Sequence, residues 1–430
     1  MKLGKLSLVA VMALGTSAFA IDNVKVDGQA KLIYQTADWE MTAAEAAAGK
    51  KTGLFEQGTV GDYLPGASYG GAASGGLSFT LGATADLTSG VSAGAEVQGF
   101  TTLGLENNLV SNVMQGGSVG TDATYANDAG SMSQLWMAST LGKTTVKVGR
   151  MELDTPLAFT EKWNLIKNTF DAAVVLNNDL PDTTLVGAWV GKHNGDTTGG
   201  GYTGHLRTYT TFGLSGAYAA GAINKSIPNT TVQGWYYNVV DVADAYWLQA
   251  DSKVMGMVNL GVQYANMDPK LADNPEYKDS SIWAVKASVD VAGVNLYAAY
   301  SDADKDGVLS FANVSTGDKT KIYTGDGSIY MDGIVTRPGA EAFKIGASTG
   351  LIPGVKLAAS YCDASDVGAA NRDISAWDVS ASGKVGPLGL TAIYTELNND
   401  TDAAGVIGAA GSIYNGRDNE TLRLIASLKF

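Results

Sequence analysis

The sequence predicts an all-β protein that closes into a transmembrane antiparallel β-barrel of about eighteen strands. Three observations support this class. Apolar residues recur at every second position in many separate segments, which is the period of a strand with one apolar and one polar face. Short turns alternate with long polar loops between these segments, as they do in outer-membrane barrels. Beyond residues 1–20, no uninterrupted apolar run reaches the length of a membrane helix.

The first segment, residues 1–20, has the composition of a secretory signal. Lys2 and Lys5 precede an apolar stretch, and residues 18–20 (AFA) form a cleavage site with small residues at its two ends. The apolar stretch is shorter than the roughly 20 residues that span a bilayer. We therefore expect residues 1–20 to be removed and residues 21–430 to form one barrel domain. Loss of the two lysines changes the formal net charge from −14 to about −16.

The first strand after this segment shows the alternation that later segments repeat. Val26 and Leu32 belong to its apolar face, Lys31 and Gln35 belong to its polar face, and Ile33 breaks the pattern. Similar alternation returns in residues 91–98, 283–291, 343–348, 355–362 and 377–382. Aromatic residues in or beside the strands are candidates for interfacial girdles: Trp136, Trp189, Trp235, Trp247, Trp283, Tyr300, Trp377 and Tyr394.

The connections between strands fall into two classes by length. Short turns are expected near residues 87–90, 141–143, 178–182, 219–228, 255–256, 292–293, 351–354 and 384–388. Long loops are expected near residues 37–75, 106–131, 151–169, 191–204, 267–280, 302–340, 363–373 and 398–420, with one brief connection at 241–243. The long loops are assigned to the external side and the short turns to the periplasmic side. A secreted β-solenoid or a multi-sandwich surface protein is the structural alternative, but no fixed repeat is visible.

The last predicted strand, residues 421–430, has the same alternation. Leu422, Leu424 and Leu428 lie on its apolar face, and Ile425 is the exception on the other face. A terminal strand that ends on Phe430 resembles the last strand of bacterial outer-membrane barrels. That resemblance implies that Phe430 belongs to the assembly signal.

Composition excludes several classes of function. The acidic balance argues against nucleic acid as a partner and favours cations inside a pore. The single cysteine, Cys362, cannot form an internal disulfide and is expected to be a small side chain within a strand. His193 and His205 are the only histidines, and the chain contains no GxSxG, phosphate-loop or CxxC motif. We therefore expect no enzymatic activity and no required cofactor.

The segment from Gly149 to Asn178 is the most specific stretch of the sequence. A strand ends at Gly149 and Arg150, residues 153–156 (LDTP) follow, and residues 168–170 (NTF) open the next strand. This pattern resembles the third-loop region of OprD-type porins. The predicted signal segment, the strand count and the C-terminal Phe are also similar to the major outer-membrane porins of Campylobacter-like bacteria. That resemblance implies a homotrimer, whereas the resemblance to OprD-type porins, which are less uniformly trimeric, leaves the oligomeric state open. The resemblance implies that loop 151–169 folds into the lumen and narrows it.

Charged residues in and near this loop are the candidates for a pore constriction, where opposed charges select the permeant ion. The basic candidates Arg207 and Arg423 lie on the lumen-facing parity of their strands. A solvated position at the rim is the alternative for each candidate. The chain has only six arginines, a departure from the long arginine ladder of OprD-type porins for carboxylated solutes. The other candidates are Arg150, Glu152, Asp154, Glu161, Lys162 and Lys167.

A second pattern lies in the loop near residues 302–340. Asp302, Asp304 and Asp306 alternate before a glycine, as in the first half of an EF-hand calcium loop, whose next ligands fall at Val308 and Ser310. The twelfth position is Asn rather than Glu, so the bidentate ligand is missing and any affinity for calcium is expected to be weak. An acidic, solvated external loop is the alternative.

The leading hypothesis is therefore a porin of the Gram-negative outer membrane. It predicts a water-filled channel for passive diffusion of small hydrophilic solutes and ions, with a preference for cations, surrounded by outer-membrane lipid and lipopolysaccharide. Two alternatives stay open. One is a substrate-specific channel for carboxylates or amino acids, and the other is a surface adhesin or structural barrel whose long loops bind a partner.

Overall fold

The structure is a computed structural model that describes residues 21–40, 47, 53–54, 74–101, 129–195, 209–270, 278–325, 330–368, 371–400 and 418–430. The predicted signal segment, residues 1–20, lies outside these ranges. Within them, no helix is both long enough and apolar enough to cross a membrane.

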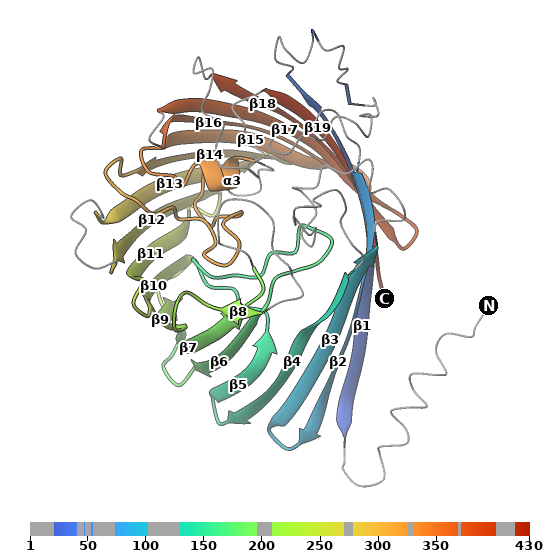
Figure 1. Cartoon of the computed structure of the whole chain (residues 1–430), viewed down its shortest axis with the longest axis vertical. Coiled ribbons are helices and arrows are strands. Elements are labelled where there is room, and N and C mark those ends of the chain that lie inside the picture. The colour runs from blue at the N-terminus through green and yellow to red at the C-terminus, as the bar shows by residue number, and fades with distance from the viewer. Residues whose placement is uncertain are drawn as a thin grey trace.

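One antiparallel sheet of nineteen strands accounts for almost all regular structure in the described ranges, and it closes on itself (Figure 1). The first strand, β1, pairs with both β2 and the last strand, β19. The two-residue strand β8 pairs only with the end of β7, while β7 pairs directly with β9, so the continuous wall contains eighteen strands. The predicted fold, an all-β barrel of about eighteen antiparallel strands, is confirmed.

The strands and the single short helix have the following bounds: β1 Asp22–Trp39, β2 Ser74–Thr88, β3 Val91–Thr101, β4 Ala129–Leu141, β5 Thr144–Met151, β6 Phe170–Asn177, β7 Thr183–His193, β8 Thr210–Thr211, β9 Ala217–Asn224, β10 Thr230–Val239, β11 Ala243–Val254, β12 Val258–Pro269, β13 Ser280–Val291, β14 Val294–Ala303, α3 Met331–Ile334, β15 Glu341–Ile352, β16 Val355–Val367, β17 Arg372–Val385, β18 Leu388–Asp400 and β19 Asn419–Lys429.

Side chains alternate between the two faces of the wall, as the sequence predicts. On β11, for example, Leu248 is exposed on the outer face while its neighbour Trp247 is fully buried on the inner face. Trp189, Trp283 and Trp377 lie on the outer face, where girdle residues are expected. The prediction that Trp235 and Trp247 are girdle residues is wrong, because both point inward and are buried in the lumen.

The predicted lengths of the connections hold with two exceptions. The expected turn at 219–228 begins too early, because the small residues Ala217–Asn224 form β9 and pair with both neighbouring strands. The expected loop at 363–373 is mostly strand: β16 continues to Val367 and β17 begins at Arg372. Asp366 and Asn371 take positive φ angles of 56° and 46°, which lets the chain turn tightly there.

Two connections enter the barrel. Figure 1 shows the segment between β5 and β6, and the segment between β14 and β15 that carries α3, inside the ring of strands. We call residues 152–169 the third loop and residues 304–340 the seventh loop. Of the seventh loop, residues 326–329 are outside the described ranges.

Candidate functional site

The third loop enters the lumen and reaches the wall at β1. Lys31 of β1 donates its ammonium to the carbonyl oxygens of Lys162 and Asn164, at 2.8 and 2.7 Å. Leu165 of the loop tip is buried next to Ile33, also of β1. Since β5 and β6 lie four and five strands away from β1 in the sheet, these contacts require the loop to lie inside the barrel. The loop therefore narrows the lumen, as the resemblance implies.

The loop tip explains the two exceptions to strand alternation. Ile33 and Ile425 face each other directly in the register of β1 and β19. Both belong to an apolar cluster on the inner face, together with Leu165 and Ile166 of the loop and Phe100 of β3. Ile33 is only 1% exposed. Ile33 and Ile425, although they lie on the lumenal face, are thus apolar because the tip of the third loop packs against them.

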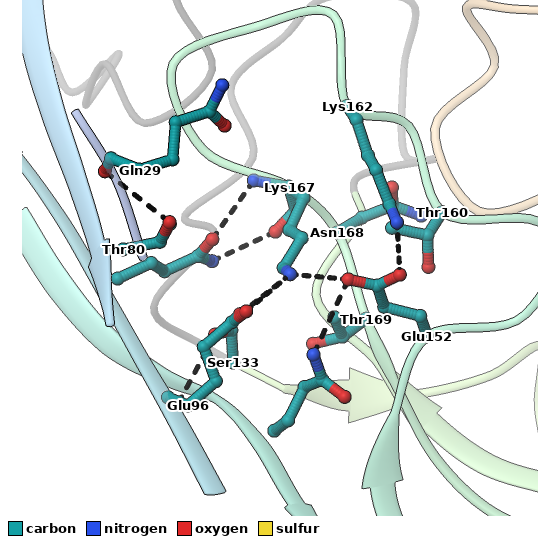
Figure 2. Close-up of polar contacts among 12 residues, drawn as sticks. Gln29, Thr80, Glu96, Ser133, Glu152, Thr160, Lys162, Lys167, Asn168 and Thr169 are labelled. Carbon is teal, nitrogen blue, oxygen red and sulfur yellow. Dashed lines mark hydrogen bonds and ion pairs between the residues drawn. The ribbon is translucent and has the colours of Figure 1, made fainter. Parts of the chain in front are cut away.

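Figure 2 shows how charge anchors the third loop to the wall. The ammonium of Lys167 lies 2.7 Å from a carboxylate oxygen of Glu96 on β3, and it also pairs with Glu152 at the base of the loop. The other oxygen of Glu152 pairs with Lys162. The side chain of Gln98 forms two hydrogen bonds with the backbone of Lys167, at 2.9 and 3.1 Å. The network ties together the base, the tip and the wall.

The ion pairs also fix the charge state of this network. Burial disfavours the charged form of Glu152, but hydrogen bonds from Lys162 and Lys167 outweigh it and lower the pKa of Glu152. Burial likewise works against the ammonium of Lys167, while Glu152 and Glu96 raise its pKa. Glu152 and Lys167 therefore stay charged near neutral pH. Glu152, Lys162 and Lys167 neutralise one another within one cluster instead of forming opposed rows across a pore.

The seventh loop covers the other side of the lumen. The hydroxyl of Tyr323 donates to Asp251 of β11 at 2.9 Å, and Tyr330 shares a hydrogen bond with Thr421 of β19 at 2.5 Å. Its apolar side chains, such as Ile322, are buried against the inward residues of β10–β14. The expectation that residues 302–340 form an external loop is therefore wrong for most of its length.

A signal for this loop was present in the wall strands rather than in the loop itself. A water-filled lumen requires polar inward residues, yet the upper half of β11 places Ala245 and Trp247 inward, and β13 places Ile282 and Ala284 inward. These strands are apolar on both faces near their long-loop ends. A wall of this kind needs a covering segment, and the seventh loop supplies it.

The two loops are joined to each other at Asn313, which is fully buried. Its amide nitrogen donates to the carbonyl oxygen of Phe159 at 2.9 Å, and its amide oxygen accepts from the Phe159 backbone at 3.3 Å. The backbone of Val314 donates to Leu157 at 2.9 Å. At the exposed edge of the junction, Lys321 pairs with Asp154 at 2.6 Å. The third and seventh loops therefore form one partition across the lumen.

Glu161 lies at the centre of this junction and is 3% exposed. One carboxylate oxygen accepts from the indole of Trp163 at 2.9 Å. The other accepts from Asn313 at 2.8 Å, from the Lys319 backbone at 3.2 Å, and from the hydroxyl of Thr316. Most of these donors come from the seventh loop. Glu161 is thus a buried link between the two loops, and its predicted part in the pore constriction stays a prediction.

The remaining predicted constriction residues are separated in space. Arg423 points inward, where it donates to the side-chain oxygen of Gln35 at 2.7 Å and lies 5.0 Å from the ring of Trp163. Arg150 shares the parity of the exposed Val148 on the outer face and pairs with Asp171 at 2.8 Å, so its predicted part in the constriction stays a prediction without a lumenal contact among the described residues. The predicted residue Arg207 lies outside the described residues.

The residues of the calcium pattern make other contacts. Asp306 pairs with Lys278 at 3.0 Å, and Asp304 accepts from the backbone of Asp306 at 2.9 Å. The backbone of Val308 donates to Ser280, and the hydroxyl of Ser310 bonds to Thr336. In the described part of the chain, no three carboxylate, histidine or cysteine side chains gather in a metal-binding group. Calcium binding by Asp302 and its neighbours stays a prediction.

The C-terminal residue closes the seam between the first and last strands. The backbone of Phe430 exchanges two hydrogen bonds with Gly28, at 2.8 and 3.1 Å. Its ring lies 5.7 Å from that of Phe79 on β2. Phe430 thus contacts both β1 and β2, next to the line where β19 closes the barrel. This position is consistent with the predicted part of Phe430 in assembly.

Comparison with known proteins shows similarity of structure but not of sequence. No family model and no curated protein matches the chain. Among solved structures, OccK9 (OpdG) of Pseudomonas aeruginosa is 15% identical with a TM-score of 0.71, covering 95% of this chain and 99% of that one. OpdK of P. aeruginosa, crystallised with vanillate, is 14% identical with a TM-score of 0.70, covering 95% and 98%. A BenF-like porin from Pseudomonas fluorescens Pf-5 is 14% identical with a TM-score of 0.70, covering 95% of this chain and 98% of that one. The fold is that of the OprD-type channels, as the third-loop region suggested.

Proposed function

We propose that the chain forms a bacterial outer-membrane channel that is selective for small carboxylated solutes. The observation that carries this proposal is the partition: two loops, joined through Asn313 and Glu161, are fixed across the lumen. A solute that passes such a partition meets side chains held in place, whereas general diffusion needs open water. The fold supports the alternative of a substrate-specific channel better than the leading hypothesis of a general, cation-preferring porin.

Arg423 is the residue that we assign to carboxylate recognition. It lies on the inner wall beside Trp163 and donates a hydrogen bond to the side-chain oxygen of Gln35. A guanidinium group binds carboxylates in a two-pronged geometry, and an aromatic ring beside it suits a solute with an apolar body. OpdK, which has the same fold, was crystallised with vanillate, an aromatic carboxylate.

The test is to record the current through the purified full chain in a planar bilayer while benzoate is added at constant ionic strength. We expect benzoate to reduce the current in a saturable manner, and neutral benzyl alcohol to have little effect. Arg423→Gln should weaken the benzoate effect about tenfold or more, which corresponds to the loss of one charge-assisted hydrogen-bonded contact. Arg372→Gln, at the first residue of β17, is the matched control.

Other results would favour the other functions. If benzoate and benzyl alcohol have equal, unsaturable effects on the current and the channel prefers cations, the general diffusion porin would be the better interpretation. A folded barrel that gives no conductance steps would favour a surface adhesin or structural barrel. Assembly into a homotrimer and contact with lipopolysaccharide stay predictions, which native gel mass and lipid analysis of the purified protein test directly.

A further inference from the structure

Three buried carboxylates lie at the junction of the third and seventh loops. Glu161 comes from the third loop, and Asp318 and Asp332 come from the seventh. All three are at least nine-tenths buried. One oxygen of Asp318, Oδ2, has no hydrogen-bond partner. A buried carboxylate oxygen without a donor is costly, so this junction needs an additional hydrogen-bond donor.

The positive charges that face the junction are already engaged. Lys319 of the seventh loop pairs with Asp332 at 2.8 Å. Lys344 of β15 donates to the carbonyl oxygen of Gly325 at 3.4 Å. Arg423 of β19 bonds to Gln35, and on β17 the carboxylate of Asp378 accepts from Thr395 at 2.6 Å. None of these contacts supplies the missing donor to Asp318 Oδ2.

We propose that Glu161 is a proton-operated latch between the third and seventh loops: protonated Glu161 donates to Asp318 and keeps the loops docked, and its ionisation releases them and widens the passage. When the proton leaves, two carboxylates face each other inside a water-poor junction, and their repulsion favours separation. The proton goes to bulk water through the separated loops, so the step needs no co-reactant.

The direction of the pH effect follows from the environment of Glu161, which lies in a loop and outside the strands. Burial, followed by the charge of Asp318, raises the pKa of Glu161 from 4.5 to about 7 against the opposing hydrogen bonds from Thr316, Trp163 and Asn313. Separated loops expose Glu161 to water and restore its ordinary pKa. The docked state therefore binds the proton more tightly. Docking is favoured at low pH, weakens by up to tenfold per pH unit between about 4.5 and about 7, and changes little above that.

The experiment measures single-channel conductance of the full chain from pH 4.5 to 8, together with hydrogen exchange of residues 157–168 and 311–325. We expect wild-type conductance and exchange to rise with pH over this window. Glu161→Gln, whose neutral amide still donates to Asp318, should remain docked and lose the pH dependence. Asp318→Asn removes the repelling charge, so the wild-type rise should end at a lower pH. Asp154→Asn is the control, because Asp154 joins the same loops at an exposed position.

A flat wild-type profile would overturn the latch, and so would a Glu161→Gln profile that follows the wild type. If Glu161→Gln does not fold, the Asp318→Asn variant decides. A rise in conductance and exchange that ends at a lower pH than in the wild type supports the proposal, and a rise that ends at the same pH rejects it. The conductance readout rests on the proposed channel function, but hydrogen exchange does not. A barrel that conducts nothing and still shows pH-dependent exchange would reject the channel and keep the latch.

Discussion

The third and seventh loops both cross the lumen, but different chemistry holds each of them. The third loop depends on charge, with Lys167 placed between Glu96 and Glu152. The seventh loop depends on apolar burial, with Ile322 and other side chains packed on inward residues such as Trp247. Charged anchors are sensitive to salt and to the loss of one partner, whereas apolar anchors are sensitive to the loss of volume. The two halves of one partition should therefore respond to different perturbations.

The largest effect is expected on the apolar side. Trp247→Ala removes a fully buried ring beneath the seventh loop and should cost that loop about 3–5 kcal/mol of docking free energy. Hydrogen exchange of residues 311–325 should accelerate, while residues 157–168 keep most of their protection. Trp283→Ala, on the outer face of a nearby strand, is the control. Equal acceleration in both loops would contradict the separation of the two anchors.

On the charged side, Lys167→Met should leave Glu96 and Glu152 facing each other with one partner fewer. The expected cost to third-loop docking is about 3 kcal/mol, and added salt should reduce it. Protease cleavage within residues 157–168 at low and high salt measures both quantities. Lys143→Met, in an exposed short turn, should change neither. A salt-independent effect would show that Lys167 acts through its aliphatic packing.

A smaller effect, shared by both loops, is expected at their junction. Asn313→Ala removes hydrogen bonds to Phe159 and Glu161 and leaves buried groups without partners, at a cost of about 2 kcal/mol. Residues 157–168 and 311–325 should then exchange faster together, and single-channel current should become noisier. Asn178→Ala in a short turn is the matched control. Faster exchange in only one loop would mean that the loops are docked independently.

The smallest effect on stability is expected at the exposed pair of Lys321 and Asp154. Lys321→Gln should change docking by less than about 1 kcal/mol, because the pair is solvated. It should nevertheless shift the reversal potential in a KCl gradient toward cations, since it removes a positive charge from the loop surface. Asp154→Asn should shift the potential in the opposite direction. Shifts of the same sign would show that neither side chain faces the passage.

The sequence predicted the barrel well because strand alternation is a local pattern. Successive side chains of a strand point to opposite faces, so Leu248 and Trp283 face outward and Lys286 faces inward. Each of these assignments needs only the neighbouring residues. The inward loops are a different case, because their contacts join distant parts of the chain. The third loop was expected through its resemblance to a known loop. The seventh loop was missed because its acidic start suggested an external calcium loop.

The candidate site was predicted less completely than the barrel. Arg423 was placed correctly on the inner face by its parity, whereas Arg150 was assigned to the constriction from its position at a strand end. Asn313 entered the sequence argument only as the wrong residue for calcium, although it joins the two loops. Its contact with Phe159 spans more than one hundred and fifty positions, and no local pattern reports such a pairing.

The apolar cluster at the seam also constrains the order of assembly. Ile33 and Ile425 lie almost four hundred residues apart and become neighbours only when the first strand meets the last. The surface that receives Leu165 is therefore only partly formed in a sheet that is still open, because Ile33 of β1 and Phe100 of β3 can be in place before Ile425 of β19 arrives. Full burial of the third-loop tip must follow closure of the wall. Protection of Leu165 and Ile166 from solvent would then report that the barrel is complete.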